Sequence, residues 1–136
     1  PKPLLQFVYK FKGADKTALC TDAMRGAGMP DGESILGSLT NGQKVIIEDG
    51  VAKLPDRSAF AGSVATADRL VRTMINIAGI PLIDAIRMIT LTPARILHVD
   101  SPKGSLEEGK DADIVIFDNQ INVTTTISKG HVIYNQ

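Results

Sequence analysis

The chain has 136 residues, of which 43% are apolar, so its length and composition suit a single globular domain. Fifteen basic residues balance fifteen acidic ones, which gives no reason to expect binding to nucleic acid or to an anionic membrane. One cysteine excludes an internal disulfide framework and every multi-cysteine metal site. We find no signal peptide and no apolar stretch near the roughly 18 residues that span a bilayer. The chain begins at Pro1 without a methionine, so we expect a fragment or a processed product of cytoplasmic origin.

The first half of the chain predicts a helix, a strand and a hairpin. Apolar residues at helical spacing over residues 3–12 predict a helix that ends before Gly13. An apolar run over residues 17–21, bounded by glycine-containing turns, predicts a short strand covered on both faces, as in parallel sheets. Cys20 should therefore be a small buried residue. Asp49-Gly50 lies between two β-prone runs and predicts a hairpin with a type I′ turn.

Three helices and then several short strands follow. A period of 3.6 over residues 64–78 predicts a helix with Ser63 as its N-cap. Pro81 opens a second helix with Leu82 facing inward, and Thr92-Pro93 opens a third, with Thr92 as its N-cap. Strands are predicted over residues 104–106, 112–117, 121–127 and 131–134, with turns at 107–110 and 129–130. Neither the α/β part nor the β part can close a sheet without further strands.

Asp22 is the first candidate for chemistry. It follows the strand predicted over residues 17–21, and the carboxyl end of such a strand is where α/β barrels place their catalytic groups. Most acidic residues after a strand are instead turn formers or helix caps. The position alone leaves both interpretations open.

Five motifs occur in one order along the chain. They are Thr21-Asp22-Ala23-Met24, the glycine-rich run to Asp31-Gly32, Phe60-Ala61-Gly62-Ser63, Leu91-Thr92-Pro93-Ala94, and Gly-Ser-Leu-Glu-Glu-Gly-Lys-Asp-Ala-Asp over residues 104–113. This order resembles the C-terminal third of the N-acetylglucosamine-6-phosphate deacetylase family, within the amidohydrolase superfamily, from about Leu5 to Tyr134. Deaminases and cyclic amidases share the last motif, whereas Thr-Asp-Ala-Met with a later Ala-Gly-Ser narrows the resemblance to the deacetylases.

The resemblance implies a fold for the whole chain. That family has a (β/α)8 barrel and a small β-sandwich built from both chain ends. Residues 1–100 would then supply the last strand, the hairpin and the closing helices of the barrel, and residues 101–136 the C-terminal strands of the sandwich. A complete barrel needs about 250 residues. We therefore expect an α/β fragment of a metal-dependent hydrolase barrel.

The resemblance also implies an activity, which is the release of acetate from N-acetylglucosamine 6-phosphate in amino sugar metabolism. In the family a divalent metal, zinc or similar, polarises the N-acetyl carbonyl and lowers the pKa of a bound water. Asp22 matches the aspartate that takes the water's proton and passes it to the departing amine. The metal ligands are histidines and a glutamate from earlier strands, so no metal ligand is expected here. His98 and His131 are interpreted as structural or surface residues.

A second segment matches family residues that lie against the sugar phosphate. Its members are Phe60, Ala61, Gly62 and Ser63. Glycine permits close backbone approach, and backbone N–H groups at a helix start favour an anion, although a plain loop with an N-cap is the alternative. Residues 24–28 could form a flap over the site or a connecting loop. Arg25 could touch phosphate or be a solvated surface residue.

Two other functions compete with the deacetylase reading: another amidohydrolase, such as a cyclic amidase or a deaminase, and a non-catalytic binding module derived from the fold. As partners we expect an amino-sugar phosphate substrate and further copies of the chain in a homo-oligomer, but no nucleic acid and no membrane. The isolated chain should be inactive without metal ligands. A fragment should also leave apolar surfaces exposed where the rest of the barrel would pack.

Overall fold

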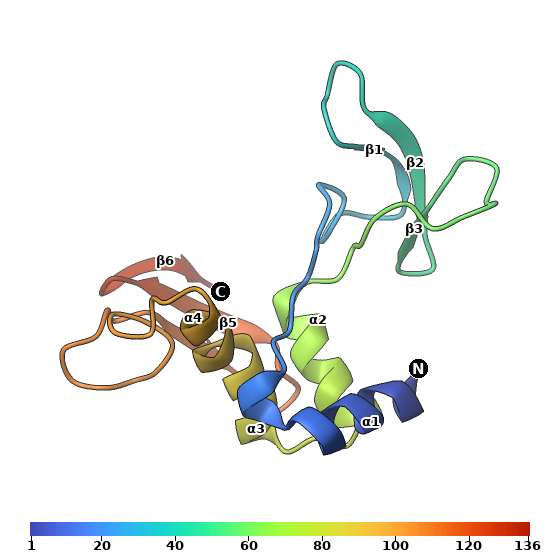
Figure 1. Cartoon of the computed structure of the whole chain (residues 1–136). Helices are drawn as coiled ribbons and strands as arrows, with labels where there is room; N and C mark the ends of the chain where they lie inside the picture. The colour runs from blue at the N-terminus through green and yellow to red at the C-terminus, as the bar shows by residue number, and fades with distance from the viewer. The chain divides into compact units, whose positions relative to one another are not determined.

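The computed structural model describes residues 1–136, which divide into two compact units (Figure 1). One unit comprises Pro1–Leu19 with Leu70–Gln136, and the other comprises Cys20–Arg69. Each unit has its own apolar core and its own three-stranded antiparallel sheet. No helix of the chain is both long enough and apolar enough to cross a membrane. The resemblance also implies a boundary near residue 100 between the barrel and the sandwich. That boundary concerns the complete barrel and stays a prediction.

Helices make up most of the first unit. They are α1 (Lys2–Lys12), the short 3₁₀ helix η1 (Ala14–Lys16), the second half of α2 (Ala67–Arg72), the π-helical turn η2 (Thr73–Ile77), α3 (Leu82–Ile89) and α4 (Leu91–Ile96). Helix α1 ends as predicted, because Gly13 has a φ of 69° and its N–H donates to the Tyr9 carbonyl at 2.8 Å. The Tyr9 hydroxyl donates to the Asp84 carboxylate at 2.5 Å and so ties α1 to α3.

The core of this unit is centred on α3. Ala85 and Met88 are fully buried, whereas Leu82 lies exposed on the same helix, so the prediction that it faces inward is wrong. Thr92 is also buried, and its hydroxyl donates to the Ala14 carbonyl at 2.7 Å. Helix α4 accordingly begins at Leu91, and Thr92 is not its N-cap, because its hydroxyl makes a bond to a distant part of the chain.

The C-terminal strands form the sheet of the first unit, with β4 (Ile114–Phe117), β5 (Val123–Ser128) and β6 (His131–Asn135) paired antiparallel in that order. These three strands confirm the predicted ones. Lys129 and Gly130 have φ values of 47° and 81°, as a tight hairpin turn requires.

The strand predicted over residues 104–106 is absent. Ser105 accepts a hydrogen bond from the Lys110 ammonium at 2.6 Å, and the same ammonium donates to the Asp100 carbonyl at 2.7 Å. Lys103 lies in the same loop and binds the carboxylates of Asp111 and Asp113 at 2.8 and 2.6 Å. Two lysines therefore organise this glycine-rich motif as a loop held by side chains instead of a hydrogen-bonded ladder.

The sheet of the second unit consists of β1 (Gly32–Leu36), β2 (Gln43–Glu48) and β3 (Val51–Lys53) (Figure 1). Asp49 and Gly50 have φ values of 54° and 70°, which confirms the predicted hairpin. Strand β1 was not predicted, because its apolar stretch is only two residues long and glycines flank it. The core residues of this unit are Met24, Val45, Ile47, Ala52 and Ala61.

The segment 17–21 does not form the buried strand that was predicted. Thr17 is extended, with φ of −132° and ψ of 114°, and the Leu19 N–H donates to the Met88 carbonyl at 2.8 Å. No strand of this chain runs beside the segment, and Cys20 is exposed instead of buried. A parallel strand acquires its ladder only from neighbouring strands. Its role as the last strand of a barrel stays a prediction.

Many large apolar side chains are exposed, as expected of a fragment. Helix α1 exposes Phe7 and Phe11, whose rings lie 4.6 Å apart, and strand β6 exposes Val132, Ile133 and Tyr134. Isolated exposed apolar residues are normal, but contiguous groups of this kind usually contact other protein surfaces.

Candidate active site

Asp22 lies at the start of the second unit, on a strained backbone. Its φ is 46°, in the left-handed region that aspartate tolerates better than most residues, and its side chain is exposed. The carboxylate makes no hydrogen bond and no ion pair. The direction of this side chain is therefore set by the backbone on either side of it and not by a partner group.

The residues that follow Asp22 lie beside the predicted substrate-binding segment. Ala23 and Ser63 form an isolated parallel bridge, and the Met24 N–H donates to the Ser63 carbonyl at 2.8 Å. The two segments are forty residues apart in sequence. The structure thus brings together the two parts of the chain that the motifs selected.

The four residues of the substrate-binding segment have different surroundings. Phe60 is 77% exposed, whereas Ala61 is buried and its N–H donates to the Ala52 carbonyl at 2.9 Å. Gly62 has a φ of 91°, and a methyl group there would lie 3.2 Å from the Leu36 side chain. Ala61 is therefore a packing residue, Gly62 is required by the backbone, and the Phe60 ring is accessible to a ligand.

Ser63 is not the N-cap of a helix, contrary to prediction. Helix α2 begins at Ala67, and the Ser63 hydroxyl accepts the Ala65 N–H at 3.1 Å in a local turn. The backbone of Ser63 is paired with Ala23, so it cannot also start a helix. The expected group of helix-start N–H donors beside Ser63 is consequently absent, which removes one of the two arguments for an anion there.

The loop before Phe60 is held by charges. The Arg57 guanidinium donates to both carboxylate oxygens of Glu48, at 2.9 and 3.1 Å, and Lys53 donates to the same group at 3.0 Å. Arg57 first, and then Lys53, lower the pKa of Glu48 below its ordinary value. The ion pairs of Glu48 with Arg57 and Lys53 hold residues 54–59 against β2 and β3, and so fix the start of the segment that begins with Phe60.

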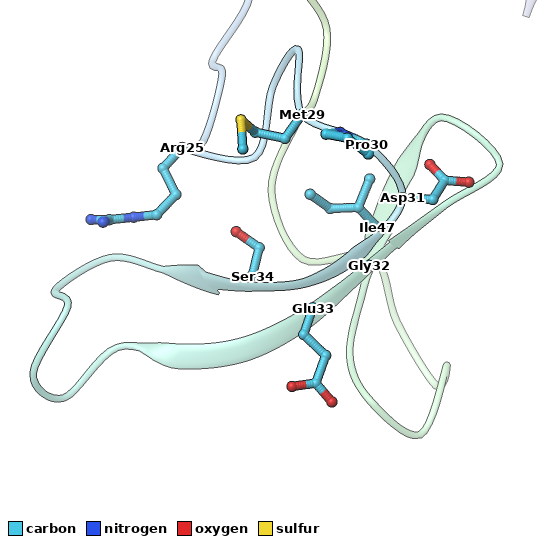
Figure 2. A pocket seen from close by; sticks show the side chains of 8 residues that line it. All are labelled: Arg25, Met29, Pro30, Asp31, Gly32, Glu33, Ser34 and Ile47. Atoms are coloured by element: carbon cyan, nitrogen blue, oxygen red, sulfur yellow. The ribbon is translucent and has the colours of Figure 1, made fainter.

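The glycine-rich loop after Met24 lies over a hollow in the β1–β2 sheet (Figure 2). The hollow has a volume of about 320 Å³ and is lined by Arg25, Met29, Pro30, Asp31, Gly32, Glu33, Ser34 and Ile47. In Figure 2 the side chains of Ser34 and Ile47 point from the strands toward the loop, whereas Glu33 points away from it.

The loop is packed, not free. Gly26 is buried, and a methyl group there would lie 2.1 Å from the Ile47 side chain. Arg25 donates to the Gly37 carbonyl at 2.9 Å and is otherwise an exposed residue. Of the two interpretations of residues 24–28, the structure shows a connecting loop docked on the sheet. The contact between Gly26 and Ile47 was not predicted from the sequence. The only signal for it was the glycine-rich composition of the loop, which is typical of a backbone that packs closely against another segment.

The chain does not contain a fitting metal site. No group of three or more histidine, cysteine, aspartate or glutamate side chains could hold a metal ion. His98 follows α4 and His131 begins β6, and both are exposed. Within this chain, no cluster of side chains completes a metal site.

The chain matches the amidohydrolase family over residues 15–133 and belongs to that family. Among its relatives, N-acetylglucosamine-6-phosphate deacetylase of Lysinibacillus sphaericus is 40% identical over 128 residues, which are 94% of this chain and 32% of that protein. N-acetylgalactosamine-6-phosphate deacetylase of Escherichia coli O157:H7 is 39% identical over 118 residues, 87% of this chain and 30% of that protein. The chain thus spans about a third of the length of these relatives, and the predicted resemblance to the deacetylases is confirmed.

Solved structures give the same result. N-acetylglucosamine-6-phosphate deacetylase from Pasteurella multocida superposes with a TM-score of 0.88 at 30% identity, covering 98% of this chain and 34% of that one. The Thermotoga maritima enzyme superposes with a TM-score of 0.85 at 30% identity, covering 99% of this chain and 36% of that one. The chain therefore has the fold of part of an amidohydrolase of the deacetylase type, as predicted.

Proposed function

We propose that the full-length protein hydrolyses the N-acetyl group of N-acetylglucosamine 6-phosphate to give glucosamine 6-phosphate and acetate. The observation that carries the proposal is the 40% identity to the Lysinibacillus sphaericus deacetylase across 94% of this chain. The superposition on the Pasteurella multocida enzyme supports it. The test is the release of acetate from this sugar phosphate by the purified full-length protein, measured with and without added divalent metal.

In this proposal Asp22 is the general base and then the general acid. Its carboxylate takes a proton from the water whose oxygen bonds to the acetyl carbon, and it returns the proton to the nitrogen as the C–N bond breaks. The exposed carboxylate without a partner leaves both oxygens available for this transfer. A structure of the Mycobacterium smegmatis deacetylase pairs an Asp→Ala variant with N-acetyl-D-glucosamine-6-phosphate, so loss of an aspartate is compatible with ligand binding in that relative.

The ligand would lie against the segment formed by Phe60, Ala61, Gly62 and Ser63, with the buried Ala61 supporting the segment from behind. The exposed Phe60 ring offers an apolar surface for a sugar face, and the missing side chain of Gly62 permits close approach to the backbone. The bridge between Ala23 and Ser63 supports a shared substrate, because it joins this segment to the residue after Asp22.

Amidohydrolases generally use a divalent metal, and this chain has no cluster of side chains that fits one. We propose that the metal, zinc or similar, is held by residues in the part of the relatives that this chain does not span. A cytoplasmic location and a homo-oligomer remain predictions.

A second candidate substrate is the galacto epimer, N-acetylgalactosamine 6-phosphate. It is favoured by the 39% identity to the Escherichia coli O157:H7 enzyme, which is almost equal to the identity to the glucosamine relative. The kcat/KM values of the full-length protein for the two sugars decide between them. A cyclic amidase, a deaminase and a non-catalytic module have no comparable support, since a β-aspartyl dipeptidase at 20% identity shares the fold alone.

A further inference from the structure

The orientation of Asp22 depends on the backbone that follows it. The residue has a φ of 46°, and its carboxylate has no partner that could hold it in place. A left-handed backbone at a residue other than glycine persists where the surrounding structure fixes it. The contacts that fix residues 23–26 therefore help to decide where the carboxylate lies, together with the backbone before Asp22.

Besides the burial of the Met24 side chain in the core, three contacts hold these residues on the second unit. The Met24 N–H donates to the Ser63 carbonyl at 2.8 Å, and the Arg25 guanidinium donates to the Gly37 carbonyl at 2.9 Å. The third is steric: the backbone of Gly26 packs against the Ile47 side chain of β2, where a methyl group on Gly26 would be only 2.1 Å from Cδ1. Only glycine permits this approach, because every other residue places a Cβ there.

Beyond Gly26 the loop has little support. The next part of the loop passes over the 320 Å³ hollow, and Met29 is 63% exposed (Figure 2). Ile47 itself is 4% exposed, so strand β2 offers a rigid surface where Gly26 approaches it. The contact between Gly26 and Ile47 is thus the last support of the loop on the sheet before it passes over the hollow.

We propose that Gly26 and Ile47 are positioning residues for Asp22: strand β2 holds the loop through this contact, and the docked loop holds the catalytic carboxylate. The proposal depends on the role of Asp22 in the proposed deacetylase. A side chain at position 26 would have to displace either the buried end of Ile47 or the loop, and a loop lifted from β2 displaces Asp22. Misplacement of a catalytic group by about 1 Å lowers the rate on the order of 10²-fold.

The test is a pair of complementary substitutions in the full-length protein. Gly26→Ala should lower kcat by about 10- to 100-fold and change KM by less than about twofold, because substrate binding does not need the carboxylate in place. Ile47→Val removes Cδ1, so Gly26→Ala with Ile47→Val should regain most of kcat. The two remaining neighbours, Ile47 Cγ1 and the Ser34 hydroxyl oxygen, would each lie 3.3 Å from the new methyl group and need to move only slightly. Ile47→Val alone removes part of the contact, so it should lower kcat, but by less than Gly26→Ala does.

A second readout does not depend on activity. Trypsin cleaves after Arg25, and docking of Gly26 should protect this bond. The rate of cleavage after Arg25 is measured by mass spectrometry and divided by the cleavage rate of the same bond in the unfolded protein. This relative rate should be higher in Gly26→Ala than in the wild type, and it should fall again in the double variant. If wild-type protein deacetylates neither sugar phosphate, the proposed function fails, while cleavage still reports whether the loop is docked.

Arg25→Lys supplies a variant without a steric clash, for use if Gly26→Ala does not fold. Arg25→Lys keeps a trypsin site but loses the geometry of the hydrogen bond to the Gly37 carbonyl. Like Gly26→Ala, it should lower kcat and increase the rate of cleavage after residue 25. A rise in KM with unchanged kcat would instead identify Arg25 as a ligand contact and overturn the proposal. Unchanged kcat and protection in Gly26→Ala, or no recovery in the double variant, would also overturn it.

Discussion

Two glycines of the motif at residues 104–113 have almost the same backbone conformation but different surroundings. Gly104 has a φ of 91° and Gly109 a φ of 89°. A methyl group on Gly104 would lie 2.8 Å from the Ala94 Cβ and 3.1 Å from the Leu91 Cα, whereas one on Gly109 would meet nothing within 4 Å. Alanine at the two positions therefore incurs the same backbone strain, but only at Gly104 does it also clash with helix α4.

The expected losses of unfolding free energy follow from the backbone strain and the steric clash. A left-handed backbone at a residue with a Cβ costs about 1–2 kcal/mol. Overpacking costs typically about 1–3 kcal/mol more. We expect Gly109→Ala to lose about 1–2 kcal/mol and Gly104→Ala about 2–5 kcal/mol of unfolding free energy.

Urea unfolding of the full-length protein, followed by circular dichroism, measures both variants. Ala94→Gly in the Gly104→Ala background removes the nearest clashing atom, so the two substitutions should show a favourable coupling despite the roughly 1 kcal/mol cost of glycine in a helix. Equal destabilisation by Gly104→Ala and Gly109→Ala would refute the packing of Gly104 against α4.

Three further predictions concern the core and its hydrogen bonds. Met88→Ala should lose about 2–5 kcal/mol of unfolding free energy in urea, because Met88 is fully buried and the cavity is only partly refilled. Thr92→Val should cost about 1–3 kcal/mol in the same assay, since it leaves the buried Ala14 carbonyl without its donor, and no loss would contradict the bond. The hydrogen bond to the Asp84 carboxylate, and then burial, raise the pKa of Tyr9 above 10.0, so this stabilisation is present below pH 10 and is lost as the pH rises through the raised pKa. The Tyr9→Phe variant should therefore unfold at a lower temperature than the wild type at neutral pH, and its stability should not fall as the pH rises through the pKa of Tyr9. The same fall in stability at alkaline pH in both proteins would contradict the role of Tyr9.

Local sequence determined the elements that need no distant partner. The Asp49-Gly50 and Lys129-Gly130 turns follow from the positive φ values that these residues adopt, and the end of α1 at Gly13 follows from the same property. Distant contacts decided the rest. The segment 17–21 reads as a strand but has no neighbour to pair with in this chain, and the hydroxyl of Thr92 bonds to Ala14 instead of capping a helix.

The candidate site divides in the same way. Asp22 and residues 60–63 were found from motifs, which record residue types in order along the chain. Their adjacency through the bridge between Ala23 and Ser63, and the approach of Gly26 to Ile47, join residues that are 40 and 21 positions apart. No periodicity or turn signal in one sequence encodes such pairs, so the support of the site became visible only in the structure.

The role of Asp22 is tested most directly by Asp22→Asn in the full-length protein, with substrate binding and turnover measured on the same preparation. Asparagine keeps the size of the side chain but cannot accept the proton. Calorimetry should show N-acetylglucosamine 6-phosphate bound nearly as tightly as by the wild type, while acetate release falls by about 10²- to 10⁴-fold. Turnover close to the wild-type rate would contradict the assignment of Asp22 as the general base, and loss of binding together with turnover would make it a structural residue.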